Sequence, residues 1–151
     1  MCAQQNCDST PGRSQQLLVA AALAYAGSAA FASVVAVRDD VPGRPLGITV
    51  PLSVTAGIAA GWGAGIAPPW YMPALAVIAA RRAGASGSTT GVMIAGSIGV
   101  ASIMGHLIEP VTWRPGSWTP GTRASIAMTM GSSALLASVA LTRCRAGGAA
   151  A

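Results

Sequence analysis

Residues 17–37 read LLVAAALAYAGSAAFASVVAV and contain no charged side chain. A helix rises about 1.5 Å per residue, so this stretch is long enough to cross the hydrocarbon core of a bilayer, which is about 30 Å thick. Three further stretches share this character, and we place them at about residues 53–80, 89–108 and 124–142. The sequence therefore predicts an all-α integral membrane protein, built as a four-transmembrane-helix bundle over residues 17–142.

The composition agrees with a membrane protein and leaves no room for a separate soluble domain. Only 9% of the 151 residues are charged and 52% are hydrophobic, whereas soluble domains carry about 25% charged residues. We expect residues 1–16 to be a polar cytoplasmic segment and residues 143–151 to be a flexible cytoplasmic tail. Whatever the protein does, the bilayer is its first partner.

The positive charge is dispersed. The net charge of +5 comes from arginine alone, because the chain has no lysine, and Arg81 with Arg82 is the one adjacent pair. A nucleic-acid interface needs enough clustered basic side chains to neutralise several phosphates, so we expect no nucleic-acid partner. Abundant alanine, glycine and arginine without lysine is also typical of a bacterial genome rich in G and C, which predicts a bacterial inner (cytoplasmic) membrane.

The arginines also predict the orientation. Four spans place both termini on the same side of the membrane. Five arginines then fall on the side of the termini, Arg13, Arg81, Arg82, Arg143 and Arg145, and four fall on the other side, Arg38, Arg44, Arg114 and Arg123. Since short cytoplasmic segments carry the excess of arginine and lysine, we expect a multi-pass protein with both termini in the cytoplasm.

The path of the second span is ambiguous. As a helix, residues 46–80 would be about 50 Å long, which exceeds the thickness of the core. One solution starts the crossing near residue 53 and bends the helix at the prolines of its second half. In the other, residues 46–67 cross and residues 70–80 lie along the cytoplasmic interface. The prediction favours a single proline-kinked helix over 53–80.

Small residues and tryptophans indicate helix contacts and interface positions. Helices associate within a bilayer through close packing, so small residues four positions apart mark contact faces. Gly57, Gly61 and Gly65 form such a series and predict helix packing, within the chain or against a second subunit. Trp113 and Trp118 flank the turn before the last span, where indole rings anchor loops at the membrane interface.

The third span has the most distinct faces. At 100° per residue, small and polar side chains fall within one narrow arc, namely Gly91, Ala95, Gly99, Ser102, His106 and Glu109. The opposite arc is apolar and is expected to face lipid, namely Met93, Val100, Met104 and Leu107.

The polar end of this face is the candidate site. Ionisable groups in membrane spans are costly and usually face a bundle interior or an aqueous cavity. His106 and Glu109 are three residues apart and are neighbours on a helix, so with Ser102 and Arg114 they form a candidate ligand site at the outer end of the third helix. The alternative is structural: Glu109 pairs with Arg114 or Arg123 and holds the outer loop.

The sequence favours binding or assembly over catalysis. His106 and Glu109 offer two metal ligands and the chain contains one histidine, so we expect no metal site, and no motif indicates a cofactor or a catalytic residue. A non-catalytic membrane subunit or scaffold, as a homo-oligomer or with a membrane partner, is the first hypothesis. The alternative is a small transporter, or a membrane protein that binds lipid or a small molecule at the polar site.

Overall fold

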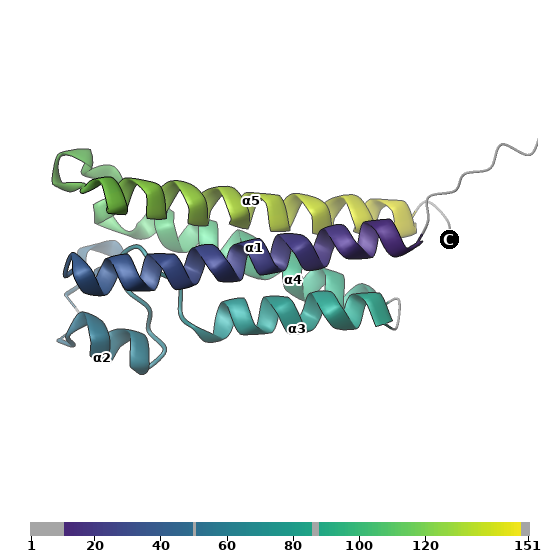
Figure 1. Ribbon diagram of the computed structural model, residues 1–151, viewed down its shortest axis with the longest axis horizontal. Coiled ribbons are helices and arrows are strands. Elements are labelled where there is room, and N and C mark those ends of the chain that lie inside the picture. Colours follow the sequence, from purple (N-terminus) through teal and green to yellow (C-terminus); the bar gives the residue numbers. More distant parts are fainter. Residues whose placement is uncertain (1–10, 50, 86–87, 149–151) are drawn as a thin grey trace, which may run out of the picture.

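The computed structural model describes residues 11–49, 51–85 and 88–148, and over these ranges it is all-helical (Figure 1). Four long helices are joined by a short helix and three 3-10 turns. They are α1 (Pro11–Arg38), η1 (Pro45–Gly47), α2 (Val54–Ala59), α3 (Tyr71–Ala85), α4 (Thr89–Ile108), η2 (Pro110–Trp113), η3 (Pro115–Ser117) and α5 (Pro120–Gly148). Residues 1–10 of the expected polar segment and 149–151 of the expected tail lie outside the described residues. Residues 143–148 of that tail are helical, because α5 continues to Gly148; its flexibility stays a prediction.

Three helices are long and apolar enough to cross a membrane: Gly12–Arg38, Thr89–Ile108 and Pro120–Ala146. Their outer surfaces carry large exposed apolar side chains, among them Val34, Met93 and Leu135. Because a soluble protein rarely exposes a continuous apolar surface, these faces contact bilayer lipids. The prediction of an all-helical membrane protein is confirmed at this level.

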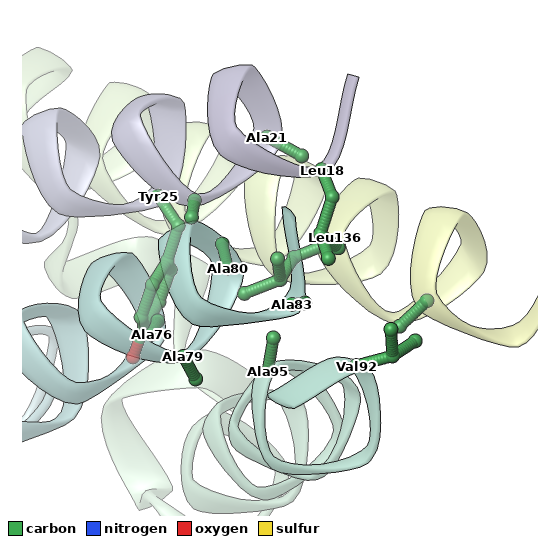
Figure 2. Close-up of a cluster of buried hydrophobic side chains, with 12 residues drawn as sticks. Leu18, Ala21, Tyr25, Ala76, Ala79, Ala80, Ala83, Val92, Ala95 and Leu136 are labelled. Carbon is green, nitrogen blue, oxygen red and sulfur yellow. The ribbon is translucent and has the colours of Figure 1, made fainter. Parts of the chain in front are cut away.

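The four long helices pack side by side in a closed ring. Helix α1 contacts α3 and α5, and α4 contacts the same two helices from the other side. We call the end where α1 and α4 terminate and α5 begins the loop end; α1 begins and α5 terminates at the opposite end (Figure 1). Tyr25, Leu18 and Leu136 are the largest members of a buried cluster otherwise made mostly of alanine, which lets the backbones approach closely (Figure 2).

Helix α4 turns its small-residue face inward. Its buried residues are Gly91, Val92, Ala95, Gly99, Ser102 and His106. A Cβ atom on Gly91 would lie 2.7 Å from the Ala79 carbonyl oxygen of α3, and one on Gly99 would lie 2.7 Å from the Ser133 carbonyl oxygen of α5. The predicted inward face of the third span is therefore confirmed, and its glycines let α4 contact the backbones of both neighbours.

The second span differs from the single proline-kinked helix expected over 53–80. Helix α2 ends at Ala59, residues 60–70 are not helical, and α3 begins at Tyr71. Gly61, two residues after α2, has a φ of +81°, which a right-handed helix cannot contain and which glycine adopts easily because it has no Cβ atom; Gly63 has a φ of +78°. Proline lacks an amide donor, so Pro68 and Pro69 keep the chain non-helical until α3 starts.

The glycine series of this segment does not form one helix face. Only Gly57 lies in a helix, and a Cβ atom there would be 3.1 Å from the carbonyl oxygen of Gly63. Gly61 lies in the turn after α2. A Cβ atom on Gly65 would be 2.8 Å from the carbonyl oxygen of Pro42. These glycines allow close contacts within a folded loop, in place of the predicted contact between two helices.

The middle of the non-helical segment lies inside the bundle. Residues 63–68 are all buried, and Ala64 and Ala67 exchange backbone hydrogen bonds of 2.9 and 3.1 Å. Helix α3 has 15 residues, or about 22 Å, and runs beside only part of α1, while α2 occupies the loop end (Figure 1). Irregular backbone at membrane depth is tolerated where protein buries it or where it lines a cavity.

Polar side chains tie the two longest helices together at the loop end. Asp39 follows α1 and accepts hydrogen bonds from Arg38 Nε at 2.8 Å, Thr119 Oγ1 at 2.5 Å and Thr122 Oγ1 at 3.3 Å. Thr119 also accepts the Thr122 amide at 3.0 Å and so caps the start of α5. The hydrogen bonds from Arg38 and Thr119 lower the pKa of Asp39 to about 2.

Candidate ligand cavity

A cavity of about 290 Å³ lies at the loop end, between α4 and the segment that contains α2 and residues 60–70. Three parts of the chain form its wall: the loop at 42–45, the segment from 52 to 72 and the last two turns of α4. Most of the lining is apolar or backbone. The lining residues of α4 and the residue that follows it are Ala101, Ser102, Gly105, His106, Ile108 and Glu109.

The structure brings together three of the four residues proposed for the polar site. Ser102, His106 and Glu109 all line the cavity because they recur on one face of α4. Arg114 does not line it; this residue is exposed between η2 and η3, where its carbonyl accepts the amide of Ser117 at 3.0 Å. The side chains of α4 thus meet the segment between α2 and α3, and Arg114, in the loop between α4 and α5, lies apart from the cavity.

His106 presents a hydrogen-bond acceptor. Its side chain is only 4% exposed, and Nδ1 lies 3.0 Å from the carbonyl oxygen of Ser102. A carbonyl oxygen can only accept, so Nδ1 carries the hydrogen, and Nε2 of the neutral ring is an acceptor. Nε2 is buried and makes no hydrogen bond in the described part of the chain, although the backbone of Ile66 also approaches the ring.

Ser102 adds a second unpartnered polar atom. Its side chain is 3% exposed, and its Oγ has no partner within residues 11–49, 51–85 and 88–148. The Tyr25 hydroxyl, from α1, approaches Ser102 but makes no hydrogen bond in this part of the chain either. Leaving a buried polar group unpaired costs about 1–3 kcal/mol. Buried hydroxyls on α5, such as Ser125 and Thr129, are also unpartnered, but only Ser102 and His106 among these residues line the cavity.

Glu109 follows α4 and holds the loop after α1. It has extended φ and ψ of −85° and 122°, as expected for the residue before a proline. Its Oε2 accepts the backbone amide of Arg44 at 2.9 Å. Burial raises the pKa of Glu109, and the hydrogen bond from Arg44 opposes that shift. Neither Arg114 nor Arg123 pairs with Glu109 among the residues described, so the structural contact goes to a different loop from the one expected.

Trp113 and Trp118 secure the loop between α4 and α5. Trp113 Nε1 donates to the carbonyl of Leu107 at 2.8 Å, and Trp118 Nε1 donates to the carbonyl of Val111 at 2.7 Å. Trp113 is 65% exposed, while Trp118 packs against a buried cluster that includes Ile66. Both indoles satisfy backbone carbonyls at or after the end of α4. Their role as membrane-interface anchors remains a prediction.

Sequence reasoning missed the part of the cavity that does not come from α4. Gly43, Trp62 and Gly63 line it, and none of them belongs to a predicted site. The available signal was the density of glycine and proline between residues 57 and 69. Such a density is equally compatible with an irregular backbone and with a kinked helix.

The chemistry available in the cavity is that of a binding site. The described residues contain no group of three or more His, Cys, Asp or Glu side chains that could hold a metal ion. An apolar wall with a few convergent polar atoms suits a small organic molecule. No protein family, curated protein or solved structure matched the chain.

Proposed function

We propose that this membrane protein binds a small molecule in the cavity at the loop end. The observation that carries the proposal is the pair of buried, unpartnered atoms, Ser102 Oγ and His106 Nε2, next to the non-helical segment at 60–70, of which residues 63–68 are buried. Breaks in membrane helices are where transporters place substrate sites. A small transporter and a membrane receptor for a small molecule both begin with this binding step.

The dimensions of the cavity limit the size of the ligand. Its volume of about 290 Å³ is at the lower end of the range for ligand pockets. Apolar side chains such as Leu52, Trp62 and Met72 contribute to the wall, and the unpartnered polar atoms come from one face of α4. The ligand we expect has a small apolar body and one polar group.

For the topology we propose four crossings of a bacterial inner membrane, with both termini in the cytoplasm. In this proposal α2, residues 60–70 and α3 together make the second crossing. The packing of α3 against both α1 and α4 supports it, since a helix lying on the membrane surface would not run along two spans. The larger group of arginines, at the end of the bundle opposite the loop end, supports the orientation.

Cysteine labelling tests this topology. In a variant without the three native cysteines, single cysteines replace Gly12, Thr89, Ser117 or Ala146, all of which are exposed. A membrane-impermeant maleimide should label Ser117→Cys in intact cells and the other three only after lysis. Labelling of Thr89→Cys without labelling of Gly12→Cys in intact cells would show that the second crossing is absent, and a fully reversed pattern would show that the orientation is wrong.

A non-catalytic membrane subunit is the second candidate. The glycines that face inward on α4 are used within the chain, against α3 and α5. A shallow apolar groove remains on the outer surface between α4 and α5, lined in part by Gly96, Ser97, Ala137 and Ser138. Small residues of this kind allow a further helix to approach closely, which favours a homo-oligomer or a membrane partner at that groove.

The test of the binding function uses two matched glycines. A Cβ atom on Gly105 or on Gly131 would meet no atom within 4 Å, so a side chain can leave the backbone without a clash at both positions. Only Gly105 lines the cavity. Native mass spectrometry of the full chain released from nanodiscs should show a retained small molecule in the wild type and in Gly131→Phe, and its loss in Gly105→Phe.

The same spectra separate the two candidates. A wild-type chain that retains lipid alone, or a molecule retained equally by both variants, would contradict the binding function at this cavity. A homo-oligomer that is unchanged in Gly105→Phe and dissociates in Ser97→Phe would support the subunit function instead.

A further inference from the structure

The cavity has a negative end. Among the described residues that line it, Glu109 is an acid and none is an arginine. Arg44 contributes its backbone amide to Glu109, and its exposed side chain is not part of the wall. The carbonyl end of α4 lies at the same place and adds partial negative charge. A positive group on the ligand would therefore be attracted, and a negative group would be repelled.

The hydrogen-bonding pattern requires a donor. His106 Nε2 accepts, because Nδ1 donates to Ser102. Glu109 Oε1 also accepts and, in the described structure, receives no hydrogen bond, since Arg44 binds the other oxygen. The Ser102 hydroxyl adapts to either role. Two acceptors beside one hydroxyl fit a group with several N–H or O–H bonds, and a carboxylate binds a charged donor more strongly than a neutral one.

The start of α3 does not reverse this preference. A helix N-terminus attracts anions through its free amides, and Pro69 and Met72 bring the start of α3 to the cavity wall. However, the Met72 amide donates to the Pro69 carbonyl at 3.0 Å, and Pro73 in the same turn has no amide hydrogen. The acidic side chain therefore dominates the local charge.

We infer that the ligand is a protonated amine with a small apolar group, whose ammonium pairs with the Glu109 carboxylate and donates to His106 Nε2. This inference rests on the proposed binding function and adds the chemical class of the ligand. The apolar body of the ligand lies against the remainder of the wall, where a phenyl ring or a short alkyl chain fits the volume of about 290 Å³.

Three probes of matched shape and different charge test the inference. They are 2-phenylethylamine, 2-phenylethanol and 3-phenylpropionate, titrated calorimetrically into the full chain in phosphatidylcholine nanodiscs at pH 8, with empty nanodiscs as the reference for partitioning. The amine should bind at least about tenfold more tightly than the alcohol, because a paired charge adds to the same apolar contact. The carboxylate should bind most weakly.

Two variants assign the preference to the cavity. Glu109→Gln keeps an oxygen that can accept the Arg44 amide, so the fold is retained, and it should weaken the amine about tenfold or more while leaving the alcohol within about twofold. Gly105→Phe should abolish binding of all three probes, and Gly131→Phe should not.

Other outcomes overturn the inference in distinguishable ways. If the alcohol binds as tightly as the amine, or the carboxylate binds more tightly than the amine, the inferred ligand class is wrong. The cavity would still be a binding site for a small molecule. The same holds if none of the probes binds while native mass spectrometry still finds a molecule that Gly105→Phe loses. If no probe binds and no molecule is retained, the proposed function is wrong as well.

Discussion

Asp39 links the end of α1 to the start of α5 through side-chain oxygens that accept from Arg38, Thr119 and Thr122. These bonds favour the ionised carboxyl and hold its pKa at about 2, compared with 3.8 for a free side chain. A carboxyl with a lowered pKa stabilises the folded state above its unfolded pKa. That contribution is lost as the pH falls from about 4 to about 2.

The change Asp39→Asn should therefore lower the thermal midpoint in detergent at pH 7. It should also flatten the dependence of the midpoint on pH between about 4 and about 2. Asp40→Asn is the matched control, because the neighbouring Asp40 is exposed and has a φ of +48°, which asparagine accepts. Equal midpoints for the two variants would mean that the Asp39 hydrogen bonds do not stabilise the bundle.

Among the elements, α4 depends most on its glycines. A Cβ atom on Gly99 would lie 2.7 Å from the Ser133 carbonyl oxygen, while one on Gly131 of α5 would meet nothing within 4 Å. Gly99→Ala should cost about 1–3 kcal/mol of unfolding free energy through overpacking. Gly131→Ala should be neutral or stabilise by up to about 1 kcal/mol, since alanine is the better helix former. Denaturant unfolding in mixed micelles compares them, and equal effects would rule out close α4–α5 contact at Gly99.

The loop that follows α2 also offers two glycines whose substitutions can be compared. Gly61 and Gly63 both have left-handed φ values, which asparagine tolerates better than other side chains. A Cβ atom on Gly61 would lie 3.5 Å from Trp70 Nε1, whereas one on Gly63 would lie 2.5 Å from the Ala67 carbonyl oxygen. Gly61→Asn should thus retain the fold and probe binding. Gly63→Asn should lose about 1–3 kcal/mol of stability, as measured by the thermal midpoint, and should lose probe binding; equal behaviour of the two variants would contradict the loop geometry.

The elements also differ in how far the sequence predicts them. For α4, the repeat of 3.6 residues per turn predicts the inward face from Gly91 to His106. The prediction works because α4 is one uninterrupted helix. In the second span the path depends on contacts between distant residues, such as Gly65 against Pro42. Local patterns do not report such contacts. For the same reason the α4 half of the cavity was predictable, and the half from Gly43 and Trp62 was not.

At the scale of the whole molecule, the bundle has two unequal halves. One buried cluster, made mostly of alanine with Tyr25 and Leu136, joins α1, α3, α4 and α5. The other, at the loop end, gathers Val35, Ile66 and Ile126 with residues of the connecting segments. Continuous helices pack in the first half. In the second, the short helix α2 and a buried loop replace part of a helix, and this replacement makes the space for the cavity.

A wall made of a six-residue helix and a loop has few cooperative backbone hydrogen bonds to break when it opens. The free energy of its local opening should therefore lie well below that of the long helices. In hydrogen–deuterium exchange of the protein in nanodiscs, the amides of α2 and residues 60–70 should exchange before those in the middle of α1, α4 and α5. Uniform protection along the chain would mean that this wall is as rigid as the bundle, and a ligand would then need a different route into the cavity.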